Sequence, residues 1–359
     1  MFDLINNSPF ESVMLPMMDR DGRAVAVVTV KATFDIKSEG LAVSQAQEPI
    51  LFDDEYNGEP GASSIKLESD IALFKPSTDV ALVGSAHAPR GKPVESLDVG
   101  VAVGPVFKII RVFGDRFWNV SFGIGWSSMS KPIPFVRMPL VYERAYGGED
   151  RTHPDQRKHT WDERNPVGTG FRVRKDRDSL HRLPLPNLED PNRLIHAWSD
   201  RPAPQGFGFI ARHWLPRRAL AGTYDERWLK ERIPLLPEDF DYRFFQGAHP
   251  DLVSPTYLRG DESFKIVNAS PEGRLQGTLP GLAIGLSVHR RHGDAYETEK
   301  RLALLDTVVF RPDDSKVNLV WRASVPCRQK ILEIEQIFAF VVSLRTAAML
   351  KKNFYGENR

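Results

Sequence analysis

Alternating hydrophobic and polar residues are concentrated toward the two ends of the chain. Phe10 to Met18 is rich in apolar residues, and Asp21-Gly22 follows as a turn pair that tolerates positive φ. Ala24 to Ile36 is dominated by valine and other residues that favour strands. This order of segments predicts an antiparallel β-hairpin.

The densest strand pattern lies between residues 71 and 122. Thr78 to Ser85 predicts one strand, and Leu97 to Val103 alternates apolar with polar or small residues. Val106 to Phe113 continues the alternation beyond Gly104-Pro105, and one of its two faces carries Val106, Lys108, Ile110 and Val112. A period of two over this length predicts an antiparallel sheet with one buried face.

The middle of the chain, from Met138 to Pro255, differs from the two ends in composition and in hydrophobic pattern. The strand pattern weakens, while proline, arginine, histidine and aromatic residues become more frequent. Because long structureless loops are rare in compact domains, we expect an ordered, irregular insertion with short helices. Thr223 and Glu226 have the spacing of a capping box and Pro234 follows, which predicts one of these helices.

Strand patterns return near the C-terminus. They cover Ala283 to His289, Arg301 to Phe310 and Lys316 to Ser324, and Pro312-Asp313-Asp314 predicts the turn between the last two. The period then changes, and one helical face would carry Ile331, Ile334, Phe338, Val341, Val342 and Arg345. This spacing predicts a C-terminal helix, and a strand from Phe338 to Leu344 is the alternative.

These patterns together predict a mainly β protein. We expect antiparallel, sandwich-like sheets with an irregular insertion rich in arginine and aromatic residues, and a C-terminal helix. The predicted organisation is a β-rich region at 1–137, the insertion with short helices at 138–255, and strands and a helix at 256–359 that complete the β system.

Composition excludes several classes of protein. The chain has 359 residues, is 41% hydrophobic and carries 48 Lys+Arg against 47 Asp+Glu, so it lacks the basic excess of a nucleic-acid-coating protein. Its single cysteine, Cys327, rules out an intrachain disulfide. The N-terminal residues lack the pattern of a secretory signal, and the longest apolar run, Ile337 to Leu344, is too short to span a bilayer. We therefore expect a cytoplasmic protein without membrane or nucleic-acid partners.

The sequence lacks the common catalytic motifs. The sequence contains no nucleophile elbow, phosphate-binding P-loop, zinc-protease motif or EF-hand loop, so we expect a non-enzymatic protein without a cofactor. A hydrolase that uses carboxylates and histidines of residues 143–213 is the alternative. Candidate metal ligands are His153, His159, His181, His196 and His213, with Asp155, Asp162 or Asp190 as carboxylate partners.

Arginine is twice as frequent as lysine and is interleaved with aromatic residues in segment 137–232. These arginines either hold an irregular insertion together or form a protein interface, where Trp, Tyr and Arg are the typical anchors. A basic cluster at 212–218 is the first interface candidate, because burying several charges is costly. The predicted partner-binding residues are Arg212, Trp214, Arg217, Arg218, Tyr224 and Trp228.

Several motifs, in this order and spacing, resemble a bacterial family catalogued as domain of unknown function number two-one-six-nine. The resemblance spans nearly the whole chain, and its longest block covers residues 204–252. The other motifs are VTVKATFDI (28–36), KPSTDVALVGSAHAP (75–89), FGDRFW (113–118), PLVYERAYGGED (139–150), NPVGTGF (165–171), LPNLEDP (185–191), LQGTLPGL (275–282), LDTVVFRPD (305–313) and LVWR (319–322).

That resemblance implies a role in type VI secretion. Members of the family look like cytoplasmic adaptors or chaperones that hold a cognate toxic effector and help to load it onto the spike tip protein. The family supplies no catalytic residues. A structural component of the secretion apparatus is the alternative that the resemblance leaves open.

Overall fold

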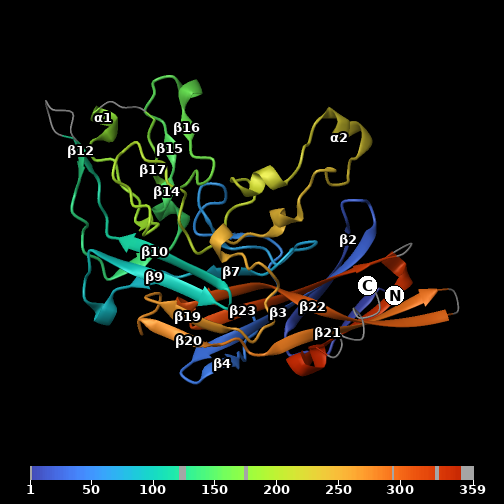
Figure 1. Cartoon of the computed structure of the whole chain (residues 1–359). Coiled ribbons are helices and arrows are strands. Elements are labelled where there is room, and N and C mark those ends of the chain that lie inside the picture. Colours follow the sequence, from blue (N-terminus) through green and yellow to red (C-terminus); the bar gives the residue numbers. More distant parts are fainter. Residues whose placement is uncertain (1, 121–126, 174–176, 293–294, 328–330, 349–359) are drawn as a thin grey trace.

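The computed structural model describes residues 2–120, 127–173, 177–292, 295–327 and 331–348 (Figure 1). Its larger sheet has nine strands, seven of them in the order β1-β24-β21-β22-β23-β3-β2, while β4 pairs with β3 and β7 runs parallel to β22. The bounds are β1 (Asp3–Asn6), β2 (Glu11–Met18), β3 (Ala24–Lys37), β4 (Gly40–Val43), β7 (Asp79–Leu82), β21 (Leu282–His292), β22 (Ala295–Arg311), β23 (Lys316–Pro326) and β24 (Ile334–Ser343).

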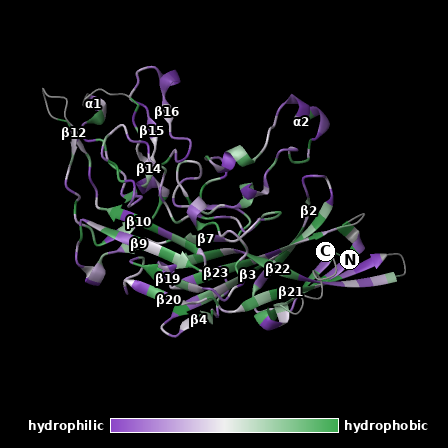
Figure 2. Cartoon of the chain, viewed as in Figure 1, coloured by the Kyte–Doolittle hydropathy of each residue, from purple (hydrophilic) through white to green (hydrophobic). Residues whose placement is uncertain are grey.

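Strands β2 and β3 form the predicted hairpin. Glu11 pairs with Lys31 and Met18 pairs with Ala24, while Gly22 in the turn has a φ of 84°, a conformation that glycine adopts without strain. β3 lies between β2 and β23, and its central residues are buried on both faces. That position explains its continuous apolar run, since a strand covered on both sides has no polar face. Figure 2 shows hydrophobic residues along β3, β22 and β23.

The larger sheet curls back on itself. β1 and β2 lie at opposite ends of the strand order, yet only residues 7–10 separate them in the sequence. A connection of this length spans at most roughly 18 Å, so the two edges must approach each other. Phe10, in the connection, stacks on Trp321 of β23 with 6.3 Å between the ring centroids. Both rings are buried, so the inside of the curl forms part of the core.

A second sheet has five strands in the order β18-β10-β9-β19-β20. The predicted alternation is confirmed, because Val106, Lys108, Ile110 and Val112 are buried and Phe107 is exposed. The two sheets meet at Phe264 of β19 and Phe310 of β22, whose ring centroids are 5.0 Å apart. The bounds are β9 (Ser96–Val103), β10 (Val106–Phe113), β18 (Leu188–Glu189), β19 (Ser263–Val267) and β20 (Arg274–Thr278).

Most of the remaining elements are short, and many lie in the middle of the chain. The strands are β5 (Glu55–Tyr56), β6 (Ile65–Leu67), β8 (Ser85–His87), β11 (Trp118–Val120), β12 (Ser127–Met129), β13 (Arg137–Pro139), β14 (Tyr146–Gly147), β15 (Glu149–Asp150), β16 (Thr160–Trp161) and β17 (Thr169–Gly170). The labelled α-helices are α1 (Arg177–Leu180) and α2 (Glu226–Glu231), and residues 344–348 form a further helical segment. The 3₁₀ turns cover Pro89–Gly91, Tyr142–Arg144, Gln156–Lys158, Arg217–Leu220, Tyr242–Phe245, Pro250–Leu252, Pro312–Asp314 and Ile331–Glu333.

A small second core explains how the irregular middle region stays ordered. Its buried residues include Trp118, Tyr146 and Ile195. Arginines brace the surrounding loops, since Arg164 binds the Asp162 carboxylate and Arg116 donates to the carbonyl of Pro186 at 3.2 Å. Many of the arginines in this region therefore have a structural role. Among the described residues, no helix combines the length and apolar character that crossing a membrane requires.

Two local predictions need correction. Asp225, rather than Thr223, caps α2 by accepting a hydrogen bond from the backbone N–H of Trp228, while Thr223 binds the carboxylate of Asp239. The C-terminal helix is present, but its described part covers only residues 344–348. Residues 334–343 form β24, the alternative we considered, because this segment pairs with both β21 and β1.

Candidate functional site

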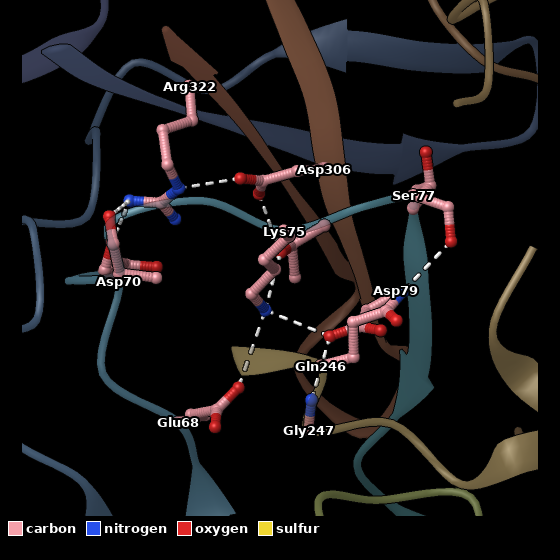
Figure 3. Close-up of polar contacts among 12 residues, drawn as sticks. Glu68, Asp70, Lys75, Ser77, Asp79, Gln246, Gly247, Asp306 and Arg322 are labelled. Atoms are coloured by element: carbon pink, nitrogen blue, oxygen red, sulfur yellow. Dashed lines mark hydrogen bonds and ion pairs between the residues drawn. The ribbon is translucent and has the colours of Figure 1, made fainter. Parts of the chain in front are cut away.

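The most unusual feature of the interior is a group of eight charged residues, which we call the ionic cluster. Figure 3 labels six of them, which are Glu68, Asp70, Lys75, Asp79, Asp306 and Arg322. The ionic cluster joins strands β3, β7, β22 and β23 to the loops beside them. Its members are Lys31, Glu68, Asp70, Lys75, Asp79, Arg217, Asp306 and Arg322, and all eight are buried.

Lys75 lies at the centre of one half of the ionic cluster. Its Nζ donates to Asp79 Oδ2 at 2.9 Å and to Thr307 Oγ1 at 3.1 Å, and it lies 3.4 Å from Glu68 Oε2. The backbone N–H of Gly247 donates to the same Asp79 oxygen at 2.9 Å. These contacts tie the loop before β7 to β22 and to the segment at 247.

Arg217 connects the cluster to the 3₁₀ turn Arg217–Leu220. Its Nη1 lies 2.7 Å from Glu68 Oε1 and 2.6 Å from the carbonyl oxygen of Ile210, and its Nη2 donates to the carbonyl of Phe244 at 2.8 Å. A Cβ on Gly247 would lie only 2.4 Å from Glu68 Oε2, so glycine lets the backbone approach this carboxylate. The 3₁₀ turn that begins at Arg217 is thereby fixed to the core.

Arg322 organises the other half of the ionic cluster. Its Nε donates to Asp306 Oδ2 at 2.6 Å, and its Nη1 donates to Thr29 Oγ1 at 2.9 Å and to the carbonyl of Asp70 at 2.8 Å. Lys31 Nζ donates to Asp70 Oδ2 at 2.8 Å. The bonds to Asp306 and Thr29 join β23 to β22 and β3, and the two bonds to Asp70 join β23 and β3 to the loop at 70.

Opposite charges balance within the cluster, which has four carboxylates and four cations. Burial alone would lower the pKa of Lys75, but Asp79 and Glu68 outweigh it and raise this pKa above its ordinary value. Burial would raise the pKa of Glu68, but Arg217 and Lys75 outweigh it and lower this pKa. Both groups are therefore charged at neutral pH, and each depends on its partners. The arrangement holds the loops at 68–79, 217 and 247 against the sheet.

Two of the six predicted partner-binding residues belong to the interior. Trp214 is 1% exposed and Arg217 is 2% exposed, so the prediction that they lie at the surface is wrong. The Trp214 ring packs edge-on against Tyr142, with 5.9 Å between centroids. The sequence argument assumed that the charge of Arg217 would be costly to bury, but Glu68 and two backbone carbonyls stabilise it.

The other four predicted residues reach the surface. Arg212 is partly exposed and lies 3.9 Å from Asp54, and Arg218 donates to Glu163 at 2.7 Å. Tyr224 and Trp228 belong to a projecting segment, residues 223–236, which we call the arm. The six predicted residues therefore do not form one site: two are buried and four reach the surface, and only Tyr224 and Trp228 belong to the arm.

The arm extends away from both sheets and includes α2 (Figure 1). Its base is held by Thr223, which donates to Asp239 at 2.9 and 2.8 Å. Arg232 reaches the β2–β3 hairpin and donates to the carbonyl of Arg20 at 2.7 Å. Within the arm, Trp228 Nε1 donates to the carbonyl of Leu235 at 2.8 Å, which folds the end of the arm against α2.

Apolar side chains of the arm face solvent although the arm itself is anchored. Tyr224 is 51% exposed, Leu229 is 55% exposed and Ile233 is 59% exposed. Tyr224 is among the residues predicted from sequence, whereas Leu229 and Ile233 are not, because an apolar residue in or beside a predicted helix is expected to face the core. Their spacing of four residues, together with Tyr224, was the available signal.

A second buried charge lies on the inner face of β10. Lys108 Nζ donates to Asp251 Oδ2 at 2.7 Å and to Gln205 Oε1 at 2.8 Å, and it lies 3.5 Å from His249 Nε2. Burial lowers the pKa of Lys108, while Asp251 opposes this effect. Burial, together with the charge of Lys108, lowers the pKa of His249 from 6.5 to about 4.

The low pKa of His249 predicts a loss of stability in mild acid. As the pH falls from about 6.5 to 4, His249 becomes protonated in the unfolded chain but stays mostly neutral in the folded chain. The free energy of unfolding therefore decreases over this interval. We expect the wild type to lose about 3 kcal/mol more over this interval than His249→Gln. Urea denaturation at a series of pH values measures this difference, and the same pH dependence in both proteins would contradict it.

The five candidate metal-binding histidines are dispersed into local contacts. His153 Nδ1 accepts the backbone N–H of Asp155 at 2.9 Å, and His159 Nε2 lies 3.0 Å from the carbonyl of His153. His181 Nδ1 accepts a backbone N–H at 3.3 Å, the backbone N–H of His196 donates to Asp200 Oδ2 at 2.9 Å, and His213 packs on Trp214. Within the part of the chain that the structure describes, no three His, Cys, Asp or Glu side chains are grouped to hold a metal ion.

The fold, the ionic cluster and the arm together define a mainly β protein with buried ion pairs and an anchored, partly apolar arm. The model of the family described as "uncharacterized protein conserved in bacteria" (DUF2169) matches residues 21–322, so the chain belongs to this family. The matched segment contains the whole ionic cluster and the arm. No curated protein and no solved structure matches the chain.

Proposed function

We propose that this protein is a non-enzymatic adaptor that binds a protein partner through the arm. The observation that carries the proposal is the exposure of Tyr224, Leu229 and Ile233 on a segment whose base is bonded to the body. Exposed apolar groups of this kind mark interaction surfaces, and aromatic residues supply much of the binding free energy at interfaces.

The charges on the arm strengthen this proposal. Arg227 lies 3.1 Å from Glu231, and Lys230 lies 3.5 Å from Glu226, so these exposed charges are paired within the arm. A partner therefore needs no strong charge of its own, and its contact surface is expected to be apolar with a polar rim. Because the arm is already anchored, little conformational entropy is lost when a partner binds.

The identity of the partner rests on the resemblance of the sequence motifs. We propose that it is a toxic effector of type VI secretion, held in the cytoplasm and passed to the spike tip protein. We propose that the arm binds one of these two partners.

Co-purification from the native bacterium tests this function. We expect the full-length chain to capture a secretion effector, as identified by quantitative mass spectrometry, and expect Tyr224→Ala/Leu229→Ala/Ile233→Ala to capture at least tenfold less. The matched control is Val43→Ala/Phe52→Ala/Tyr296→Ala, which removes three exposed side chains elsewhere. Equal capture by the two variants, with unchanged melting temperatures, would contradict the proposal.

A further inference from the structure

A cavity of about 550 Å³ lies apart from the arm. Three segments form most of its walls: residues 115–117 after β10, residues 139–144 from the end of β13 onward, and residues 182–187 after α1; Thr169 of β17 completes the lining. Phe117, Val141 and Leu185 supply apolar surface, while Arg144 and Arg182 bring guanidinium groups to it. A mixed lining of this kind suits a ligand that carries both an apolar group and an anion.

Arg182 is the most distinctive residue of this cavity. Its guanidinium carbon lies 3.8 Å from the centroid of the Phe117 ring, so the cation packs over that ring. Its φ is 67°, in the left-handed region, where a residue other than glycine costs on the order of 1 kcal/mol. The side chain is exposed, and no carboxylate among the described residues pairs with it.

The two carboxylates that line the cavity, Glu143 and Asp115, already accept hydrogen bonds from other residues of the chain. Glu143 accepts the backbone N–H of Ser64 at 2.6 Å and its hydroxyl at 2.7 Å. Asp115 accepts from Arg144 at 3.1 Å and from Asn187 at 2.9 Å. Of the three arginines that line the cavity, Arg144 pairs with Asp115 and Arg116 pairs with Glu189, so Arg182 is the one without a carboxylate partner among the described residues.

We propose that this cavity binds an acidic segment of the protein partner, with a carboxylate on Arg182 and a neighbouring apolar side chain against Phe117, Val141 and Leu185. The planar guanidinium of an arginine binds a carboxylate with two parallel hydrogen bonds. This inference rests on the proposed adaptor function and adds a second contact, separate from the arm.

Peptide display tests the inference with random sequences as the probe. Twelve-residue peptides of random sequence, displayed on phage, are selected on the full-length chain and, in parallel, on Arg182→Glu. We expect Asp and Glu to be enriched in the peptides selected on the wild type, and expect this enrichment to disappear on Arg182→Glu. Selected peptides without such enrichment would overturn the inference.

Affinities of one selected acidic peptide complete the test. By fluorescence anisotropy, we expect Arg182→Ala to weaken binding at least tenfold, Arg182→Lys to weaken it less, and the exposed control Arg193→Ala to leave it unchanged. Equal affinities for Arg182→Ala and Arg193→Ala would refute the site. The arm variant keeps the two proposals distinguishable, since effector capture that depends on the arm but not on Arg182 leaves the adaptor function standing.

Discussion

Replacing Lys75 with methionine is expected to lower the free energy of unfolding by about 3–5 kcal/mol. Methionine keeps much of the length of the side chain but removes the charge, so Asp79 and Glu68 lose the cation that lies 2.9 and 3.4 Å from them. Both carboxylates are buried, and water cannot replace the lost partner. Since domains have only about 5–15 kcal/mol of stability, the loss is a large share.

Urea denaturation at pH 7 measures the effect of Lys75→Met. The control Lys66→Met changes an exposed lysine of the same region and is expected to shift stability by less than about 0.5 kcal/mol. Lys75→Met/Asp79→Asn removes one orphaned carboxylate as well and is expected to recover part of the loss. A loss below about 1 kcal/mol for Lys75→Met would show that the ionic cluster does not stabilise the core in this way.

Trp214→Ala is expected to destabilise the chain by about 3–5 kcal/mol, because truncation of a buried aromatic side chain leaves a cavity. Trp214 is 1% exposed and packs on Tyr142, so neighbouring side chains cannot fill its volume without moving. From sequence, Trp214 and Arg218 both belong to one predicted interface. In the structure, Trp214 lies in the core and Arg218 lies at the surface.

Arg218→Ala is the comparison that checks this division. Arg218 is half-exposed and pairs with the equally exposed Glu163, and exposed pairs of this kind contribute about 0–1 kcal/mol. Thermal unfolding should therefore separate the two variants clearly. Similar melting temperatures for Trp214→Ala and Arg218→Ala would mean that Trp214 is not a core residue.

The elements that could be predicted from sequence are those whose periodicity has one interpretation. Val106 to Phe113 alternates strictly, and its buried and exposed faces agree with the prediction. Residues 334–343 were harder, because their apolar residues fit a period of 3.6 as well as a strand. Pairing with β21 and β1 decides between the two, and the local sequence does not contain that information.

The ionic cluster could not be assembled from sequence, because its members lie between residues 31 and 322 and only the fold brings them together. A weaker signal was nevertheless present. Lys31 interrupts the apolar motif VTVKATFDI, Arg322 ends LVWR, and Lys108 shares a face with three apolar residues. A charge inside an apolar strand predicts a buried partner, although it does not name that partner.

The most direct test of the central claim is the dissociation constant of the purified partner for the full-length chain and its arm variant. By isothermal titration calorimetry, we expect Tyr224→Ala/Leu229→Ala/Ile233→Ala to bind at least tenfold more weakly than the wild type, while Val43→Ala/Phe52→Ala/Tyr296→Ala binds with wild-type affinity. A dissociation constant for the folded arm variant equal to that of the wild type would contradict binding through the arm.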